Sequence, residues 1–180
     1  MIYVLLGTGF EETEAVAPID LLRRANLEVI TVGLNGKTVC GSHGIGIVAD
    51  ILPEEMKLEA MDMIVLPGGL GGVASIRSSE SAMHAIRYAH EHDKFVAAIC
   101  AGPTILAQLG ITSGKAAVCY PGCEEEMGNA KICPDAPAIR DGKVITAASA
   151  GCAISFGLAL IEALKGKEEA NHIAQQIVIR

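Results

Sequence analysis

The residue best suited to nucleophilic chemistry is a cysteine placed between an apolar run and the start of a helix. Cys100 follows the run Phe95–Ile99 and precedes Gly102 and Pro103, which suit a turn into a helix. A buried strand would deliver this thiol to the carboxyl edge of a parallel sheet, where open α/β folds bind ligands. Because backbone N–H groups at a helix start favour the thiolate, Cys100 is predicted to be a nucleophile or a redox-active thiol.

Carboxylates near the N-terminus offer the thiol an acid–base partner. Glu11, Glu12 and Glu14 lie at the start of a predicted helix. Acidic side chains commonly cap helices, and this is our interpretation of Glu11 and Glu12. Glu14 lies further inside the helix, so it could face the thiol instead. A desolvated carboxyl there would be protonated and could donate a hydrogen bond to the thiolate or carry protons.

A glycine pair after another strand offers backbone donors. Gly68 and Gly69 follow the apolar run Met63–Leu66, and the segment is either a tight turn or part of an oxyanion hole. Glycine N–H groups can approach a developing negative charge without hindrance from a side chain. In the second interpretation, the N–H groups of Gly69 and Ala101 are the two donors.

The elements needed to bring these segments together alternate regularly along the chain. Apolar runs and helical patterns follow one another as in βαβ winding, which predicts a mostly parallel sheet with helices on both faces. Two short runs within 38–48 predict a β-hairpin excursion. The remaining expected strands are Ile2–Gly7, Leu27–Gly33, Ala116–Tyr120, Lys131–Cys133 and the hairpin Ala138–Arg140 with Lys143–Thr146; the expected helices are Thr13–Ala25, Ser81–His92, Thr104–Leu109, Ile154–Leu164 and Glu168–Ile177, with a helical turn over Glu124–Met127.

Composition narrows the class of protein. A chain of 180 residues that is 51% hydrophobic predicts one domain over 1–180 with a full core. A net charge of −7 with no cluster of Lys and Arg argues against nucleic acid as a partner. The apolar first residues are too short to cross a bilayer and lack a cleavage signal. Six cysteines in such a chain are interpreted as thiols, which predicts a cytoplasmic protein.

Two further cysteines flank Tyr120. Cys119 and Cys123 are either small buried hydrophobes or resolving thiols that form a disulfide with oxidised Cys100. The paired spacing of structural zinc sites is absent, so we expect no metal, and no motif indicates a cofactor. The histidines are scattered, and we assign none of them a catalytic role.

Taken together, these motifs resemble the ThiJ/PfpI superfamily, in the clade of the parkinsonism-associated deglycase and chaperone proteins. The resemblance covers essentially the whole chain. It implies a flavodoxin-like three-layer sandwich and a homodimer. It also implies that Cys100 is the nucleophile or redox cysteine and that Glu14 is its carboxyl partner. Gly69 and Ala101 would be the backbone donors, with Gly68 beside them. The matching segments are Glu11–Glu14 with Pro18–Arg24, Leu66–Gly69, Ala97–Pro103 and Glu162–Glu168.

The chain also departs from that family. Tyr120 stands where the clade often has a histidine, His43 stands where an arginine is expected, and Ala101 replaces the histidine that follows the nucleophile in the peptidase branch. The alanine at position 101 argues against a Cys-His peptidase. The resemblance implies a cofactor-independent enzyme that acts on small reactive carbonyls or glycated proteins. The alternative is a redox-responsive stress protein or chaperone whose Cys100 is oxidised to sulfenate or sulfinate.

Overall fold

The computed structural model describes residues 1–179, in which six strands form the central sheet, in the order β2-β1-β5-β6-β10-β9. Only β9 runs antiparallel to its neighbour β10; the other adjacent strands are parallel. The sheet strands are β1 Ile2–Leu6, β2 Val29–Gly33, β5 Met63–Leu66, β6 Phe95–Ile99, β9 Ala138–Asp141 and β10 Val144–Ala147. The parallel strands place the ends of β1, β5 and β6 at one edge, as βαβ winding predicts.

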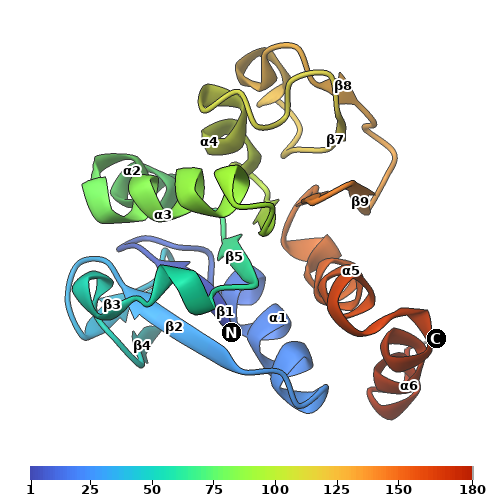
Figure 1. The fold of residues 1–180 in the computed structure, drawn as a ribbon, viewed down its shortest axis with the longest axis horizontal. Helices are drawn as coiled ribbons and strands as arrows, with labels where there is room; N and C mark the ends of the chain where they lie inside the picture. The colour runs from blue at the N-terminus through green and yellow to red at the C-terminus, as the bar shows by residue number, and fades with distance from the viewer. Residues whose placement is uncertain (180) are drawn as a thin grey trace.

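Helices cover both faces of this sheet and make a three-layer sandwich (Figure 1). Alternation along β1 shows why both faces are covered: Val4 packs with α1, α5 and α6, whereas Leu5 packs with α2, α3 and α4. The predicted α/β sandwich is therefore confirmed. The helices are α1 Glu12–Arg24, α2 Leu70–Ser78, α3 Glu80–Glu91, α4 Pro103–Gln108, α5 Ala153–Lys165 and α6 Lys167–Gln176.

Short elements extend the sandwich. The predicted hairpin excursion is present as β3 Thr38–Cys40 and β4 Gly46–Val48. The strand predicted over 116–120 is shorter, because β7 covers only Ala116–Ala117 and pairs in parallel with β8 Lys131–Ile132. Short 3₁₀ turns occur at Pro53–Glu55, Leu58–Ala60, Glu124–Met127 and Ala150–Cys152. None of the helices within residues 1–179 is long and apolar enough to span a bilayer.

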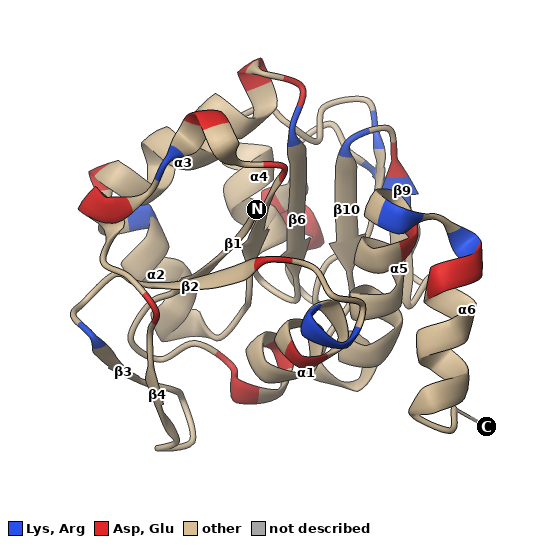
Figure 2. Cartoon of the chain, turned by 60° about the horizontal axis from the view of Figure 1, so that its bottom comes forward, with Lys and Arg blue, Asp and Glu red and all other residues tan. Residues whose placement is uncertain are grey.

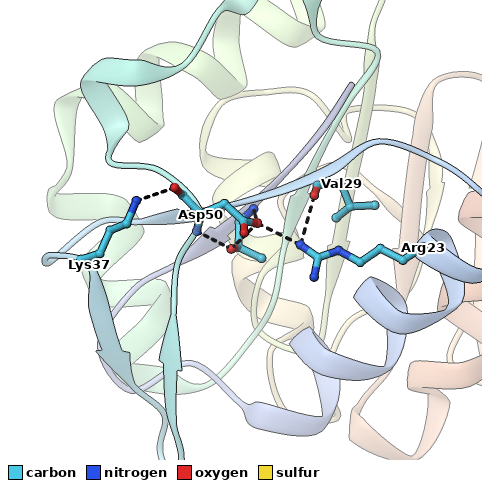
Figure 3. A network of polar contacts seen from close by, with 5 residues as sticks. Arg23, Val29, Lys37 and Asp50 are labelled. Atoms are coloured by element: carbon cyan, nitrogen blue, oxygen red, sulfur yellow. Dashed lines mark hydrogen bonds and ion pairs between the residues drawn. The ribbon is translucent and has the colours of Figure 1, made fainter.

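A polar network ties the base of the β3–β4 hairpin to the sheet (Figure 3). One carboxylate oxygen of Asp50 accepts hydrogen bonds from the backbone N–H and the hydroxyl of Thr31, both 2.8 Å, and from the Arg23 guanidinium, 2.9 Å. Arg23 also donates to the carbonyl of Val29, and Lys37 to that of Asp50. Although burial opposes ionisation, the Thr31 bonds and the Arg23 charge hold the pKa of Asp50 below its usual value.

Candidate active site

The cysteine elbow is strained. Cys100 follows β6 directly and has φ of 66°, a left-handed conformation that a residue with a Cβ adopts only at a cost. Its backbone is held on both sides, because its N–H donates to the Ala147 carbonyl at 2.9 Å and its carbonyl accepts from the Tyr120 N–H at 2.8 Å. Helix α4 then begins at Pro103, one residue before the predicted start at Thr104. The strain is the kind that surrounding structure maintains at functional sites.

Helix α1 brings Glu14 to the thiol. Glu14 is only 1% exposed, and its carboxyl lies beside the Cys100 thiol: Glu14 Oε2 and Cys100 Sγ are 2.5 Å and 3.1 Å from the point that a Cβ on Gly68 would occupy. The Gly68 N–H donates to Glu14 Oε2 at 2.9 Å. Three segments that are far apart in the sequence therefore meet at one sheet edge, in the arrangement that the strand order predicts.

Gly68 leaves the space in which this contact forms. A Cβ at this position would lie 2.5 Å from Glu14 Oε2 and 2.6 Å from the Cys100 Cβ, both shorter than real contacts. Gly69 follows with φ of 84° and is the N-cap of α2. The backbone N–H groups of Gly69 and Ala101, the two donors expected from the sequence, favour the thiolate and lower the pKa of Cys100.

Burial controls the protonation of the Glu14–Cys100 pair. Desolvation is the main cause that raises the pKa of Glu14 from 4.5 to about 7. Desolvation, the charge of Glu14 and its hydrogen bond together raise the pKa of Cys100 to about 12, against the weaker effect of the Ala101 and Gly69 N–H groups. The sequence predicts an acidic thiolate because it indicates only the backbone N–H donors. Burial and the Glu14 carboxyl, which raise the pKa of the thiol, depend on the fold. Near neutral pH Cys100 therefore holds its proton while Glu14 is partly protonated, and protonation of Glu14 removes the charge that opposes the thiolate.

The capping interpretation holds for Glu11 but not for Glu12. Glu11 is the N-cap of α1 and accepts from the Glu14 N–H at 2.7 Å. Glu12 instead accepts from the loop between β3 and β4: from the backbone N–H of His43 at 2.6 Å, its Nδ1 at 2.9 Å and the Ser42 hydroxyl at 3.2 Å. Although burial opposes ionisation of Glu12, its bonds with His43 lower the pKa of this carboxyl to about 2. A buried carboxylate therefore holds this loop at the site.

The site opens into a cavity of about 710 Å³. Tyr120, 49% exposed, and Cys123 both line it, whereas Cys119 is buried in a small cluster with Ala117 and Met127. The structure thus separates the two cysteines that the sequence leaves equivalent. Sequence reasoning missed other lining residues, which come from α2 and from the turn after β10: Leu70, Gly71, Ser149, Ala150 and Gly151.

A strained cysteine on a strand–helix elbow, paired with a buried carboxyl in a flavodoxin-like sandwich, defines a class of cysteine-centred α/β protein. The DJ-1/PfpI family model matches residues 1–163, and the chain belongs to this family. The chain is 35% identical to protein dj-1beta of Drosophila melanogaster, over 98% of this chain and 95% of the relative. It is 28% identical to a protein named deglycase PYRAB04690 from Pyrococcus abyssi, over 91% and 99% of the two chains.

Solved structures agree in fold and extent. The crystal structure of Drosophila melanogaster DJ-1beta has a TM-score of 0.94 and covers 99% of this chain and 97% of its own, at 34% identity. A structure of Toxoplasma gondii DJ-1, described as oxidized, has a TM-score of 0.91 with 33% identity, covering 98% and 97%. These matches confirm both the resemblance and the flavodoxin-like fold.

Proposed function

We propose that this protein is a cysteine-dependent enzyme that converts small reactive carbonyls, or their early adducts on proteins, without a cofactor. The observation that carries the proposal is the Glu14–Cys100 pair, in which a buried carboxyl with a pKa of about 7 lies beside a strained thiol. A relative named as a deglycase supports the same class of substrate.

The chemistry balances without an oxidant. Cys100 sulfur adds to the aldehyde carbon of methylglyoxal while its proton moves to the carbonyl oxygen through Glu14, which forms a hemithioacetal. The N–H groups of Gly69 and Ala101 stabilise negative charge that develops beside the sulfur. Glu14 then takes the proton from the former aldehyde carbon and delivers it to the neighbouring carbon, while the hydroxyl proton passes from the first oxygen to the neighbouring oxygen; the product is the thioester of lactate. Water hydrolyses the thioester to lactate and restores the thiol.

The test measures lactate formed from methylglyoxal by wild type, Cys100→Ser and Glu14→Gln. Cys133→Ser is the matched control, because Cys133 is a free cysteine that does not line the cavity. We expect both site variants to lose at least about a hundredfold in rate, since each removes a group that takes part in bond formation or proton transfer. Equal rates in wild type and Cys100→Ser would refute the proposal.

A second candidate function is a redox-responsive stress protein or chaperone, and the position of Cys123 in the Cys100 cavity favours it. Peroxide would oxidise the Cys100 thiolate to sulfenate and be reduced to water; the Cys123 thiol would then displace water to form a disulfide. Mild peroxide treatment should lower the intact mass by about 2 Da in wild type and in Cys119→Ser, but not in Cys123→Ser. Added oxygen without any mass loss in wild type would exclude the disulfide step.

We also propose that the protein is a homodimer, as the family resemblance implies. One apolar groove lies between α1, the start of α5 and the segment that follows α6, and it is lined by Val16, Ile154, Val178 and Ile179, which are 47%, 39%, 66% and 50% exposed. A second copy of the chain is the occupant that we expect on this surface. Light scattering should show that Val16→Asp shifts the protein to monomer, whereas Val48→Asp, at another exposed valine, leaves the dimer intact. A dimer that survives Val16→Asp would place the interface elsewhere.

A further inference from the structure

Acidic side chains outnumber basic ones around the Cys100 cavity. Among the described residues that line it, Glu11 and Glu14 are acidic, and no lysine or arginine is present. His43 is the one side chain of this lining that can carry a positive charge near neutral pH. Figure 2 shows Lys and Arg segments where β6 and β10 begin, at the end of the sheet opposite the elbow. Any ligand that enters the cavity therefore meets carboxylates and one imidazole.

That imidazole is outnumbered by carboxylates. Ligand atoms of Glu11, Glu12 and His43 all lie within 4.8 Å of one another. His43 Nδ1 is 2.9 Å from Glu12 Oε2, and the Ser42 hydroxyl is 3.1 Å from the same ring nitrogen. Even when His43 is fully protonated, its positive charge is thus balanced by the negative charge of Glu12, and the charge of Glu11 is not compensated. This rim stays negative in sum when all three groups are charged.

A fixed cation beside the Cys100 cavity does not change this balance. Arg77 lies in an adjoining depression that shares Leu70, Ala101 and Cys123 with the Cys100 cavity. Its guanidinium is occupied, because it donates to the Thr104 hydroxyl at 2.8 Å and pairs with Glu126 at 3.1 Å. The depression therefore adds the Glu126 carboxylate together with the Arg77 guanidinium, and these two charges cancel.

We propose that this cavity selects uncharged electrophiles over electrophiles that carry a carboxylate or phosphate, and that His43 sets the degree of selection. The inference rests on the proposed function and names its substrate class: neutral oxoaldehydes such as methylglyoxal, rather than anionic aldehydes. The negative potential of these carboxylates lowers the local concentration of anions and opposes their approach to the sulfur. Neutral aldehydes do not experience that repulsion.

The test uses two alkylating reagents that differ only in charge. Iodoacetamide is neutral and iodoacetate is anionic; each forms a C–S bond with Cys100 and releases iodide. Peptide mass spectrometry measures the two rates at Cys100, and free glutathione supplies the intrinsic ratio of the reagents. We expect the preference of Cys100 for iodoacetamide to exceed that of glutathione by about five- to tenfold, since one charge at this range changes a rate by that order.

Three variants locate the cause of the preference. His43→Arg adds a fixed cation and should lower the preference at least about threefold. Glu11→Gln should lower it as well, because it removes a rim carboxylate while its amide oxygen can still cap α1. His90→Arg adds the same charge on the exposed surface of α3 and should change nothing.

The outcomes separate this inference from the proposed function. A wild-type preference equal to that of glutathione would overturn the inference, as would equal responses to His43→Arg and His90→Arg. Failure of both reagents to label Cys100 would instead refute the reactive thiol on which the proposed function depends. Labelling with the expected preference but without lactate formation would leave the selectivity standing and refute the carbonyl conversion.

Discussion

Replacing Glu14 with glutamine should make the protein more stable at high pH while it removes activity. The folded-state pKa of this carboxyl is about 7, compared with 4.5 for an unburied carboxyl, and desolvation is the main cause. The folded protein therefore binds more protons than the unfolded chain between these two values. Stability falls as pH rises through this window and levels off above it.

The size of the effect follows from the same two values. A difference of about 2.5 at ~1.4 kcal/mol per pKa unit corresponds to about 3 kcal/mol. This is an upper bound, because the carboxyl borders an open cavity and retains part of its solvation. Glutamine keeps a carbonyl oxygen that can accept from the Gly68 N–H, and it cannot ionise.

Urea unfolding of wild type and Glu14→Gln, at fixed protein concentration from about pH 4 to about pH 8, measures the effect. The difference in unfolding free energy should move in favour of the variant by up to about 3 kcal/mol across this range, mostly below pH 7. Contributions of Asp50, Glu12 and other groups are common to both proteins and cancel. Glu59→Gln, on the exposed surface, is the control. A difference that does not change with pH would refute the assignment of a desolvated, protonated Glu14.

Two further predictions concern space and anchoring. Gly68→Ala should abolish labelling of Cys100 and destabilise the fold by about 1–3 kcal/mol, because the new Cβ would lie 2.6 Å from the Cys100 Cβ. Gly46→Ala is the control and should have neither effect, since its Cβ would meet only a Thr38 methyl at 3.8 Å. Asp50→Asn should lower the urea-unfolding free energy by about 1–2 kcal/mol, since a charged acceptor of several hydrogen bonds is lost. Asp20→Asn, which loses only an exposed pair with Arg24, is its control, and equal losses in the two aspartate variants would contradict the anchoring role.

The sheet, most helices and the heart of the site could be predicted from the sequence because their signals are local. Apolar runs that alternate with helical patterns determine the winding order, and parallel strands then force Glu14, Gly68 and Cys100 to one edge. Helix α2 was not predicted. Its sequence begins Leu70-Gly71-Gly72, which weakens the helical signal, and burial of Val73 and Ile76 against the sheet stabilises it instead.

The rest of the site depends on contacts between distant segments. The bonds of Glu12 to Ser42 and His43 join residues about thirty positions apart, so nothing local distinguishes Glu12 from the capping Glu11. The raised pKa of Cys100 has the same origin, because desolvation and the charge of Glu14 depend on how α1 packs against the elbow. The sequence alone indicates which candidate groups meet at the site, but not the balance of their charges.

The left-handed backbone of Cys100 has a consequence for how the chain would drift if selection for its chemistry were relaxed. At φ of 66°, replacing Cys100 with glycine relieves strain of roughly 1 kcal/mol or more, as glycine adopts this conformation freely. A chain freed from its function would therefore gain stability by discarding its cysteine. At this position the backbone favours glycine, and the thiol is present against that preference because the surrounding structure holds it there.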